Sequence, residues 1–184
     1  MGLRMTPEQL IIALIRVLGS LPVLKWAFIG AIIAIVVDFS DLFWMSVINL
    51  GGVQDYQTFD KFLDLVYMFA FLSVSFRWTN LDRNIAIGLF IFRMLGLIAF
   101  EFTGDRMFLF YFPNVFEFWF IFVAGRKRFF PSKEGHISAV YIALPACLLA
   151  KLGQEWIIHG AKYLDQFTFF EAVEAIYSLL VFWV

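Results

Sequence analysis

The chain has 184 residues, of which 62% are hydrophobic and only 16% are charged, and its formal net charge is −1. Soluble domains have roughly a quarter of their residues charged, so this composition and a mean hydropathy of +0.83 exclude an ordinary soluble protein. The net charge gives no support to nucleic-acid binding, and a lone cysteine excludes an internal disulfide framework. The chain is therefore expected to lie in a lipid bilayer.

Residues 1–20 predict an interfacial amphipathic helix. Thr6 is a suitable helix cap, and Pro7 occupies the first helical position, where its missing N–H costs nothing. The apolar run that follows contains Arg16 and is too short to cross a bilayer before Pro22. We expect this helix to lie at the membrane surface.

Six apolar segments of about spanning length follow, separated by polar turns and one basic loop. We expect transmembrane helices at about residues 21–40, 60–78, 83–102, 107–124, 137–158 and 169–184. Within the third segment, Gly88 and Gly96 predict close contact with a neighbouring helix. The expected fold is all-α, a single polytopic membrane domain built as a six-transmembrane-helix bundle with an N-terminal interfacial helix.

The basic residues predict the orientation of the bundle. If the N-terminus is cytoplasmic, nine basic residues fall on the inner side and few outside, as the positive-inside rule requires. The inner set is Arg4, Arg16, Lys25, Arg77, Arg83, Arg126, Lys127, Arg128 and Lys133. We therefore expect both termini in the cytoplasm, in a plasma (inner) membrane. Almost all the acidic residues then fall in the outer half of the bundle.

Acidic residues in the outer half outnumber the bases that could neutralise them. An ionisable group at membrane depth costs about 2.5–3.5 kcal/mol, so such groups normally face the bundle interior and find partners. The outer-half acids are Asp38, Asp41, Asp60, Asp64, Glu101, Glu117 and Glu155, against Arg93 and Lys151. This excess requires either protons or cations. We predict that the four aspartates hold a divalent cation such as Mg²⁺, Mn²⁺ or Ca²⁺.

Polar residues at helical spacing in the fifth segment predict one wall of the same site. Lys151, Glu155 and His159 are four residues apart and share a helix face, with Gln154 beside them. We assign proton transfer to Glu155 or His159. Lys151 completes the catalytic set and, with Arg93, is expected to hold the anionic group of the substrate. The alternative is a structural role, in which Lys151 and Glu155 form an ion pair and His159 lies at the membrane interface.

Substrate contacts are expected from Arg93, Asn114, Glu117 and Gln154, which lie at comparable depth in three segments. Buried ion pairs that fix helix packing are the alternative for the charged members of this set. Haem is not expected, because His136 and His159 would lie at opposite ends of one helix.

The four aspartates have the form Asp38-x-x-Asp41 followed by Asp60-x-x-x-Asp64. This spacing resembles the paired-aspartate skeleton of the CDP-alcohol phosphotransferases, over roughly a seventh of the chain. The resemblance implies two metal ions held between adjacent helices and transfer from a CDP-linked lipid to an alcohol. The chain departs from the family pattern at Leu42, Met45, Ser46 and Tyr56, and membership is not claimed.

Three functions remain open. The first is a metal-assisted enzyme that acts on a lipid-linked or phosphate-bearing substrate at the outer leaflet. The second is a small cation- or proton-coupled transporter or channel. The third is an accessory or assembly subunit of a membrane complex. Membrane lipids are expected partners, with either a second copy of the chain or other membrane subunits. Sparse polar residues in the inner half favour the first function.

Overall fold

The computed structural model describes residues 5–47, 50–53, 56–105, 107–131 and 137–155. These residues form helices joined by short connections, and none of them lies in a strand, so the all-α prediction is confirmed for this part of the chain. The chain divides into two units, Met1–Lys151 and Leu152–Val184. Of the described residues, only 152–155, the last turn of α8, belong to the second unit. A single domain stays a prediction.

The first four elements are α1 (Pro7–Ser20), the 3-10 helix η1 (Leu21–Leu24), α2 (Ala27–Phe39) and α3 (Asp41–Val47). The predicted start at Thr6 is confirmed: its hydroxyl accepts from the Gln9 backbone N–H at 3.2 Å, and the Gln9 side chain accepts from the Thr6 N–H at 3.0 Å. This capping box fixes where α1 begins.

The remaining elements are α4 (Tyr56–Ser75), α5 (Asn80–Thr103), α6 (Met107–Tyr111), α7 (Val115–Phe129) and α8 (Ile137–Glu155). Gly104 ends α5 in the left-handed region, at φ 69°, where glycine has no steric penalty. The expected fourth transmembrane segment is interrupted, because Pro113 lies between the end of α6 and the start of α7.

Four helical segments in the described residues are long and apolar enough to cross a membrane: Pro7–Leu24, Ala27–Met45, Leu81–Thr103 and Met107–Phe129. The protein is accordingly an integral membrane protein. The predicted number of six spans is not confirmed. The interfacial position of the amino-terminal helix is not confirmed either, because α1 and η1 together reach spanning length. The sixth predicted segment, 169–184, lies outside the described residues.

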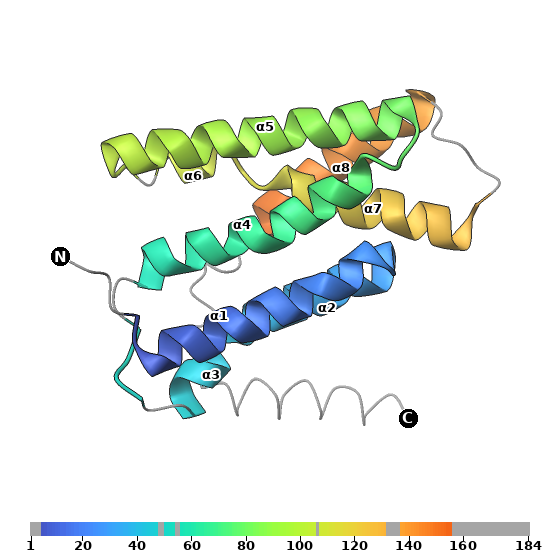
Figure 1. Ribbon diagram of the computed structural model, residues 1–184. Coiled ribbons are helices and arrows are strands. Elements are labelled where there is room, and N and C mark those ends of the chain that lie inside the picture. The colour runs from blue at the N-terminus through green and yellow to red at the C-terminus, as the bar shows by residue number, and fades with distance from the viewer. Residues whose placement is uncertain (1–4, 48–49, 54–55, 106, 132–136, 156–184) are drawn as a thin grey trace, which may run out of the picture. The chain divides into compact units, whose positions relative to one another are not determined.

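Helices α1 and α2 lie side by side and run in opposite directions, and α4 packs against both of them (Figure 1). Large aromatic side chains fill the centre: Phe71, Phe116, Trp119 and Phe120 are completely buried. Phe71 stacks on Phe120 with ring centroids 4.1 Å apart. This aromatic core joins α4 to α7 and α5.

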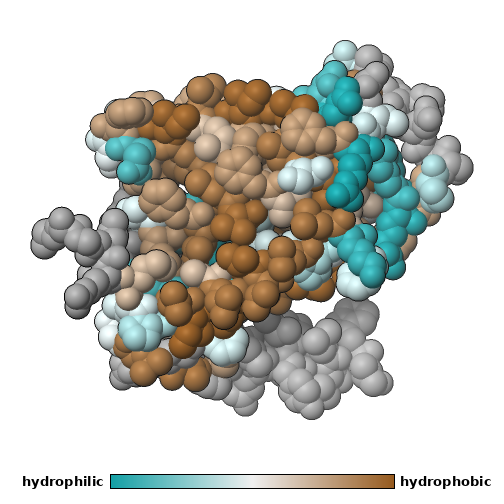
Figure 2. Space-filling model, in the orientation of Figure 1, coloured by the Kyte–Doolittle hydropathy of each residue, from teal (hydrophilic) through white to brown (hydrophobic). Residues whose placement is uncertain are grey.

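The outer surface carries an apolar band. Figure 2 shows hydrophobic side chains across the visible face and hydrophilic ones gathered at the end where α4 joins α5 and α7 ends. Phe62, Phe69, Phe76, Ile91 and Leu95 are each at least half exposed. Such a band is expected where side chains face lipid.

One predicted glycine contact is confirmed, and the other is not found among the described residues. A Cβ on Gly96 would lie 2.3 Å from the Cβ of Phe112, so the glycine lets the α6–α7 connection approach α5 closely. In the part of the chain that the structure describes, no heavy atom of another segment lies within 4 Å of the corresponding position on Gly88. This close approach brings the interrupted segment against Arg93, one turn earlier on α5.

Candidate functional site

Arg16 lies at the centre of the four aspartates. Its Nη2 atom is 2.6 Å from Asp38 Oδ1 and 2.8 Å from Asp41 Oδ2. The same atom contacts Asp60 Oδ1 at 2.5 Å, and Nη1 is 3.0 Å from Asp64 Oδ1. We call these five residues the Arg16 cluster. The cluster joins α1, through Arg16, to the aspartates of α2, α3 and α4.

The local sequence explains how the carboxylates converge on Arg16. Asp38 and Asp41 lie on either side of Ser40, where α2 ends and α3 begins, and their spacing of three residues lets both side chains reach Arg16. The Ser40 hydroxyl donates to the Val37 carbonyl at 2.6 Å and satisfies one acceptor at this helix end. Asp60 and Asp64 are one turn apart on α4 and share a face.

The Arg16 cluster is closed on one side and open on the other. The Arg16 and Asp41 side chains are 3% and 2% exposed, whereas those of Asp38, Asp60 and Asp64 are 25%, 33% and 21% exposed. Three carboxylates can therefore be reached from outside, while the guanidinium and Asp41 remain buried.

Tyr56 begins α4 beside the open side of the cluster. Burial, and after it the negative charges of Asp60 and Asp41, raise the pKa of the Tyr56 phenol above its ordinary value. The neutral phenol adds no charge to the site.

One arginine cannot neutralise four carboxylates. With all groups ionised, four negative charges and one positive charge leave −3. Arg16 pairs with one oxygen of each carboxylate, so every aspartate keeps a second oxygen for a further cation or a proton. One such atom, Asp41 Oδ1, is buried and has no hydrogen-bond partner. Buried charge of this kind is unfavourable unless it is compensated.

Three of the aspartates are close enough to share an ion. Asp38, Asp60 and Asp64 each offer a carboxylate oxygen, and these oxygens lie within 4.8 Å of one another. Ligand oxygens on opposite sides of Mg²⁺ or Ca²⁺ are about 4–5 Å apart, because the metal–oxygen distances are about 2.0–2.6 Å. The three carboxylates thus have the spacing and chemistry of a hard-cation site.

A second polar group lies deeper in the bundle. The Asn114 side-chain amide donates to the Tyr67 hydroxyl at 3.1 Å and to Glu117 Oε2 at 3.4 Å. All three residues are buried, and Glu117 is near enough to Asp38 for their charges to interact. Tyr67 follows Asp64 by one helical turn on α4. The polar residues therefore continue from the Arg16 cluster towards the α6–α7 connection.

The α6–α7 connection is unwound backbone within an apolar segment. Arg93 Nη1 donates to the Phe112 carbonyl at 2.9 Å and to the Leu109 carbonyl at 3.4 Å. At membrane depth, backbone groups outside helices need internal partners. Arg93 supplies them here, and its charge also interacts with Asp64.

The polar groups do not continue through the bundle in the described residues. Below Tyr67 and Glu117, the contacting rings of Phe71, Phe116 and Phe120 fill the space between α4 and α7. Among the described residues, these rings separate the polar groups from the opposite end of the bundle.

A separate ion pair lies at the opposite end. Asp82 is completely buried and contacts Arg126 Nη2 at 2.5 Å and Lys127 Nζ at 3.4 Å. Thr79 and Trp119 add hydrogen bonds to Asp82 at 3.1 and 3.2 Å. Arg126 and Lys127, which also served to predict the orientation of the bundle, therefore join α7 to the start of α5.

The structure brings together most of the predicted site residues, but with a different base. Asp38, Asp41, Asp60 and Asp64 converge as expected, with Asn114, Glu117 and Arg93 next to them. The assignment of Arg16 to the membrane surface opposite these acids is wrong, because Arg16 contacts all four aspartates. The helical spacing of four residues places Ile12, Arg16 and Ser20 on one face of α1, and all three are buried.

Residues of the fifth predicted span are only partly described. Lys151 is buried in α8, and Gln154 is half-buried near its end. The Glu155 side chain and His159 lie outside the described residues. The proposed grouping of Lys151, Gln154, Glu155 and His159 with the aspartates stays a prediction.

Comparisons with known proteins assign no family: no family model, no curated protein and no solved structure matches the chain. The resemblance to CDP-alcohol phosphotransferases therefore rests on the aspartate spacing alone.

Proposed function

We propose that this integral membrane protein binds a divalent cation at Asp38, Asp60 and Asp64, and that the cation assists a reaction on a lipid-linked or phosphate-bearing substrate. The observation that carries the proposal is the excess of three negative charges around Arg16, with three carboxylates partly exposed. A bound Mg²⁺, Mn²⁺ or Ca²⁺ would reduce this charge to −1. Arg16 and Asp41 would stay buried and would hold the three ligand aspartates in position.

The one-sided shape of the site favours an enzyme over a carrier. Substrate and water reach an active site from one side, whereas a transport path needs polar groups on both sides of the binding site. Here the rings of Phe71, Phe116 and Phe120 close the inner side. A cation at the open side would polarise a phosphoryl oxygen of the substrate.

Arg93, Asn114 and Glu117 are proposed to contact the substrate beyond the metal. Arg93 carries the positive charge suited to a phosphate, although two backbone carbonyls share its guanidinium. Asn114 has a buried Oδ1 atom without a partner, and Glu117 accepts from its amide. The catalytic roles of Lys151, Glu155 and His159, and substrate contact by Gln154, belong to the same proposal.

A cation-coupled transporter is the second candidate, and the break between α6 and α7 favours it. Discontinuous transmembrane helices in transporters place unwound carbonyls and helix ends at the substrate or ion site. The Phe112–Asn114 segment has this form and lies beside the acidic residues. In this reading, rearrangement of the aromatic core would open the inner side.

Orientation follows from the same residues. On the positive-inside rule we take the basic stretch Arg126–Arg128 as the cytoplasmic end of the bundle, and we propose that the Arg16 cluster lies in the outer leaflet of a plasma membrane. The amino end of α1 is held at the cluster end, where Glu8 accepts from the backbone N–H groups of Leu50 and Gly52 at 3.2 and 3.0 Å. We therefore place the start of α1 outside, in contrast to the expected cytoplasmic N-terminus.

Two measurements on the purified protein separate the candidates. The first is Mn²⁺-dependent turnover of a membrane lipid extract, which is measured by phosphate release and by lipid chromatography. Asp64→Asn should abolish this turnover. Asp105→Asn, which alters an exposed acid, should keep it. Divalent-cation flux into proteoliposomes with the same dependence, and no turnover, would favour the transporter. If neither turnover nor flux is detected and both variants behave as the wild type does, the accessory-subunit function is favoured.

A further inference from the structure

Positively charged side chains gather at the end of the bundle away from the four aspartates, where several helix ends meet. Arg77 follows the end of α4, and its Nη1 atom donates to the Leu24 carbonyl, just before α2, at 3.0 Å. The Phe28 ring near the start of α2 lies 5.3 Å, centroid to centroid, from the Phe129 ring at the end of α7. Asp82 joins α7 to the start of α5. These helix ends contribute to the hydrophilic end of the molecule that Figure 2 shows.

This end carries an excess of positive charge. Among the described residues its acid is Asp82, and its basic side chains are Lys25, Arg77, Arg83, Arg126, Lys127 and Arg128. Arg126 and Lys127 share Asp82. We call Lys25, Arg77 and Arg128 the basic rim. In the described part of the chain their contacts are with uncharged groups, which are the Trp26 ring, the Leu24 carbonyl and the Phe129 ring. The charges of the basic rim are therefore not compensated by a carboxylate there.

Each residue of the basic rim has a large, outward-facing ring as its neighbour in the chain. Trp26 is 52% exposed, Phe76 is 56% exposed and Phe129 is 59% exposed. In an integral membrane protein, a cation beside an exposed ring suits the boundary between lipid headgroups and hydrocarbon, because the ring meets acyl chains while the cation reaches the phosphates. An acidic soluble protein would contact the cations but not rings at that depth. The pairing of ring and cation therefore favours a lipid as the partner.

We propose that the basic rim binds an anionic phospholipid. The lipid phosphate lies beside Lys25 and Arg77, which the contact of Arg77 with Leu24 brings together, and the acyl chains pack beside the exposed rings. A headgroup with a net negative charge, as in phosphatidylglycerol, compensates the charge of the basic rim. A choline headgroup carries its own cation and supplies no net negative charge. The basic rim should therefore prefer anionic over zwitterionic lipids, whether or not the aspartates bind a cation.

Native mass spectrometry of the full-length protein tests this assignment with phosphatidylglycerol and phosphatidylcholine of equal chain length. The wild type should hold phosphatidylglycerol at least about tenfold more tightly, and added salt should reduce the difference. One basic residue near an anionic lipid surface contributes about fivefold to binding. Lys25→Gln and Arg128→Gln should each weaken phosphatidylglycerol binding by about that factor and leave phosphatidylcholine binding unchanged. Both side chains are exposed, so both variants should unfold at the wild-type temperature.

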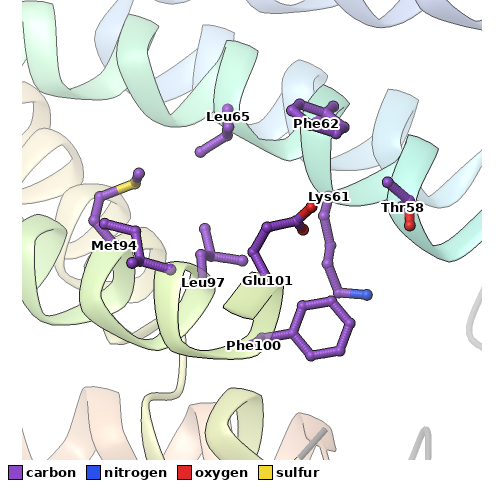
Figure 3. A pocket seen from close by; sticks show the side chains of 9 residues that line it. Thr58, Lys61, Phe62, Leu65, Met94, Leu97, Phe100 and Glu101 are labelled. Atoms are coloured by element: carbon purple, nitrogen blue, oxygen red, sulfur yellow. The ribbon is translucent and has the colours of Figure 1, made fainter. Parts of the chain in front are cut away.

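Lys61→Gln is the matched control, because it removes the same charge at the opposite end of α4. Lys61 lies beside Glu101 at the mouth of a groove between α4 and α5 (Figure 3), so an acid already accompanies it. This variant should hold phosphatidylglycerol as the wild type does.

Three results would overturn the assignment. The first is equal retention of both lipids by the wild type. The second is wild-type retention of phosphatidylglycerol in the double variant Lys25→Gln/Arg128→Gln, or equal losses in Lys61→Gln and Lys25→Gln. The third is displacement of the lipid by inorganic phosphate at the same concentration, since phosphate alone makes no contact with the rings and would identify a site for a soluble anion.

Discussion

Replacing Arg16 by glutamine tests the arrangement of the Arg16 cluster most severely. The guanidinium is 3% exposed and contacts four carboxylates, which the variant leaves without their buried counter-charge. Removing one partner of a buried ion pair costs about 3–5 kcal/mol. For a chain of this size that corresponds to a fall in Tm of roughly 6–20 °C.

Thermal unfolding of the detergent-solubilised protein, followed by tryptophan fluorescence, measures the effect. Added Ca²⁺ should restore stability to Arg16→Gln more than to the wild type, since the variant has one more uncompensated negative charge.

Arg77→Gln is the matched control for Arg16→Gln. Arg77 is exposed and donates to the Leu24 carbonyl at 3.0 Å, so its replacement should change stability by about 0.5 kcal/mol or less. An Arg16→Gln protein that unfolds at the same temperature as Arg77→Gln, at pH 8 and without divalent ions, would refute the account of the cluster.

Two further predictions concern packing and topology. Gly96→Ala should destabilise the protein by about 1–3 kcal/mol, because its new methyl group would meet Phe112. Gly88→Ala should be neutral or slightly stabilising, because its methyl group would enter open space. Denaturant unfolding of both variants measures this difference in stability. In a cysteine-free background, Leu50→Cys should react with an impermeant thiol reagent added outside intact cells and Phe130→Cys should not. Labelling of both positions from the same side would contradict the orientation.

Helix starts and the acidic site could be predicted because they depend on short-range patterns. Thr6 and Pro7 are local signals, and the capping box they indicate is present. The aspartates could be grouped because acids at membrane depth seek the bundle interior. No contact between distant segments was needed for either inference.

The partner of the aspartates could not be predicted in the same way. Arg16 was assigned by counting spans from the N-terminus, and that count took residues 1–20 as interfacial. The assignment failed because α1 packs antiparallel to α2, which brings Arg16 to the level of Asp38. The Asp82–Arg126 pair escaped prediction for the same reason, since its partners are 44 residues apart and meet only when α5 and α7 pack.

The break between α6 and α7 was visible in the sequence but was given no weight. Pro113 disfavours helix for the residue before it and cannot donate a backbone hydrogen bond. A continuous span was expected because the apolar run extends across it. The structure instead leaves the Phe112 carbonyl for Arg93, a tertiary contact that hydropathy does not encode.

Direct measurement of cation binding tests the central claim. Equilibrium dialysis of the purified protein against radioactive Ca²⁺ should give one bound ion per chain. The triple variant Asp38→Asn/Asp60→Asn/Asp64→Asn should bind none at the same free concentration, and Asp105→Asn should bind as the wild type does. Absence of bound ion in the wild type, or undiminished binding in the triple variant, would contradict the assignment of these three aspartates as cation ligands.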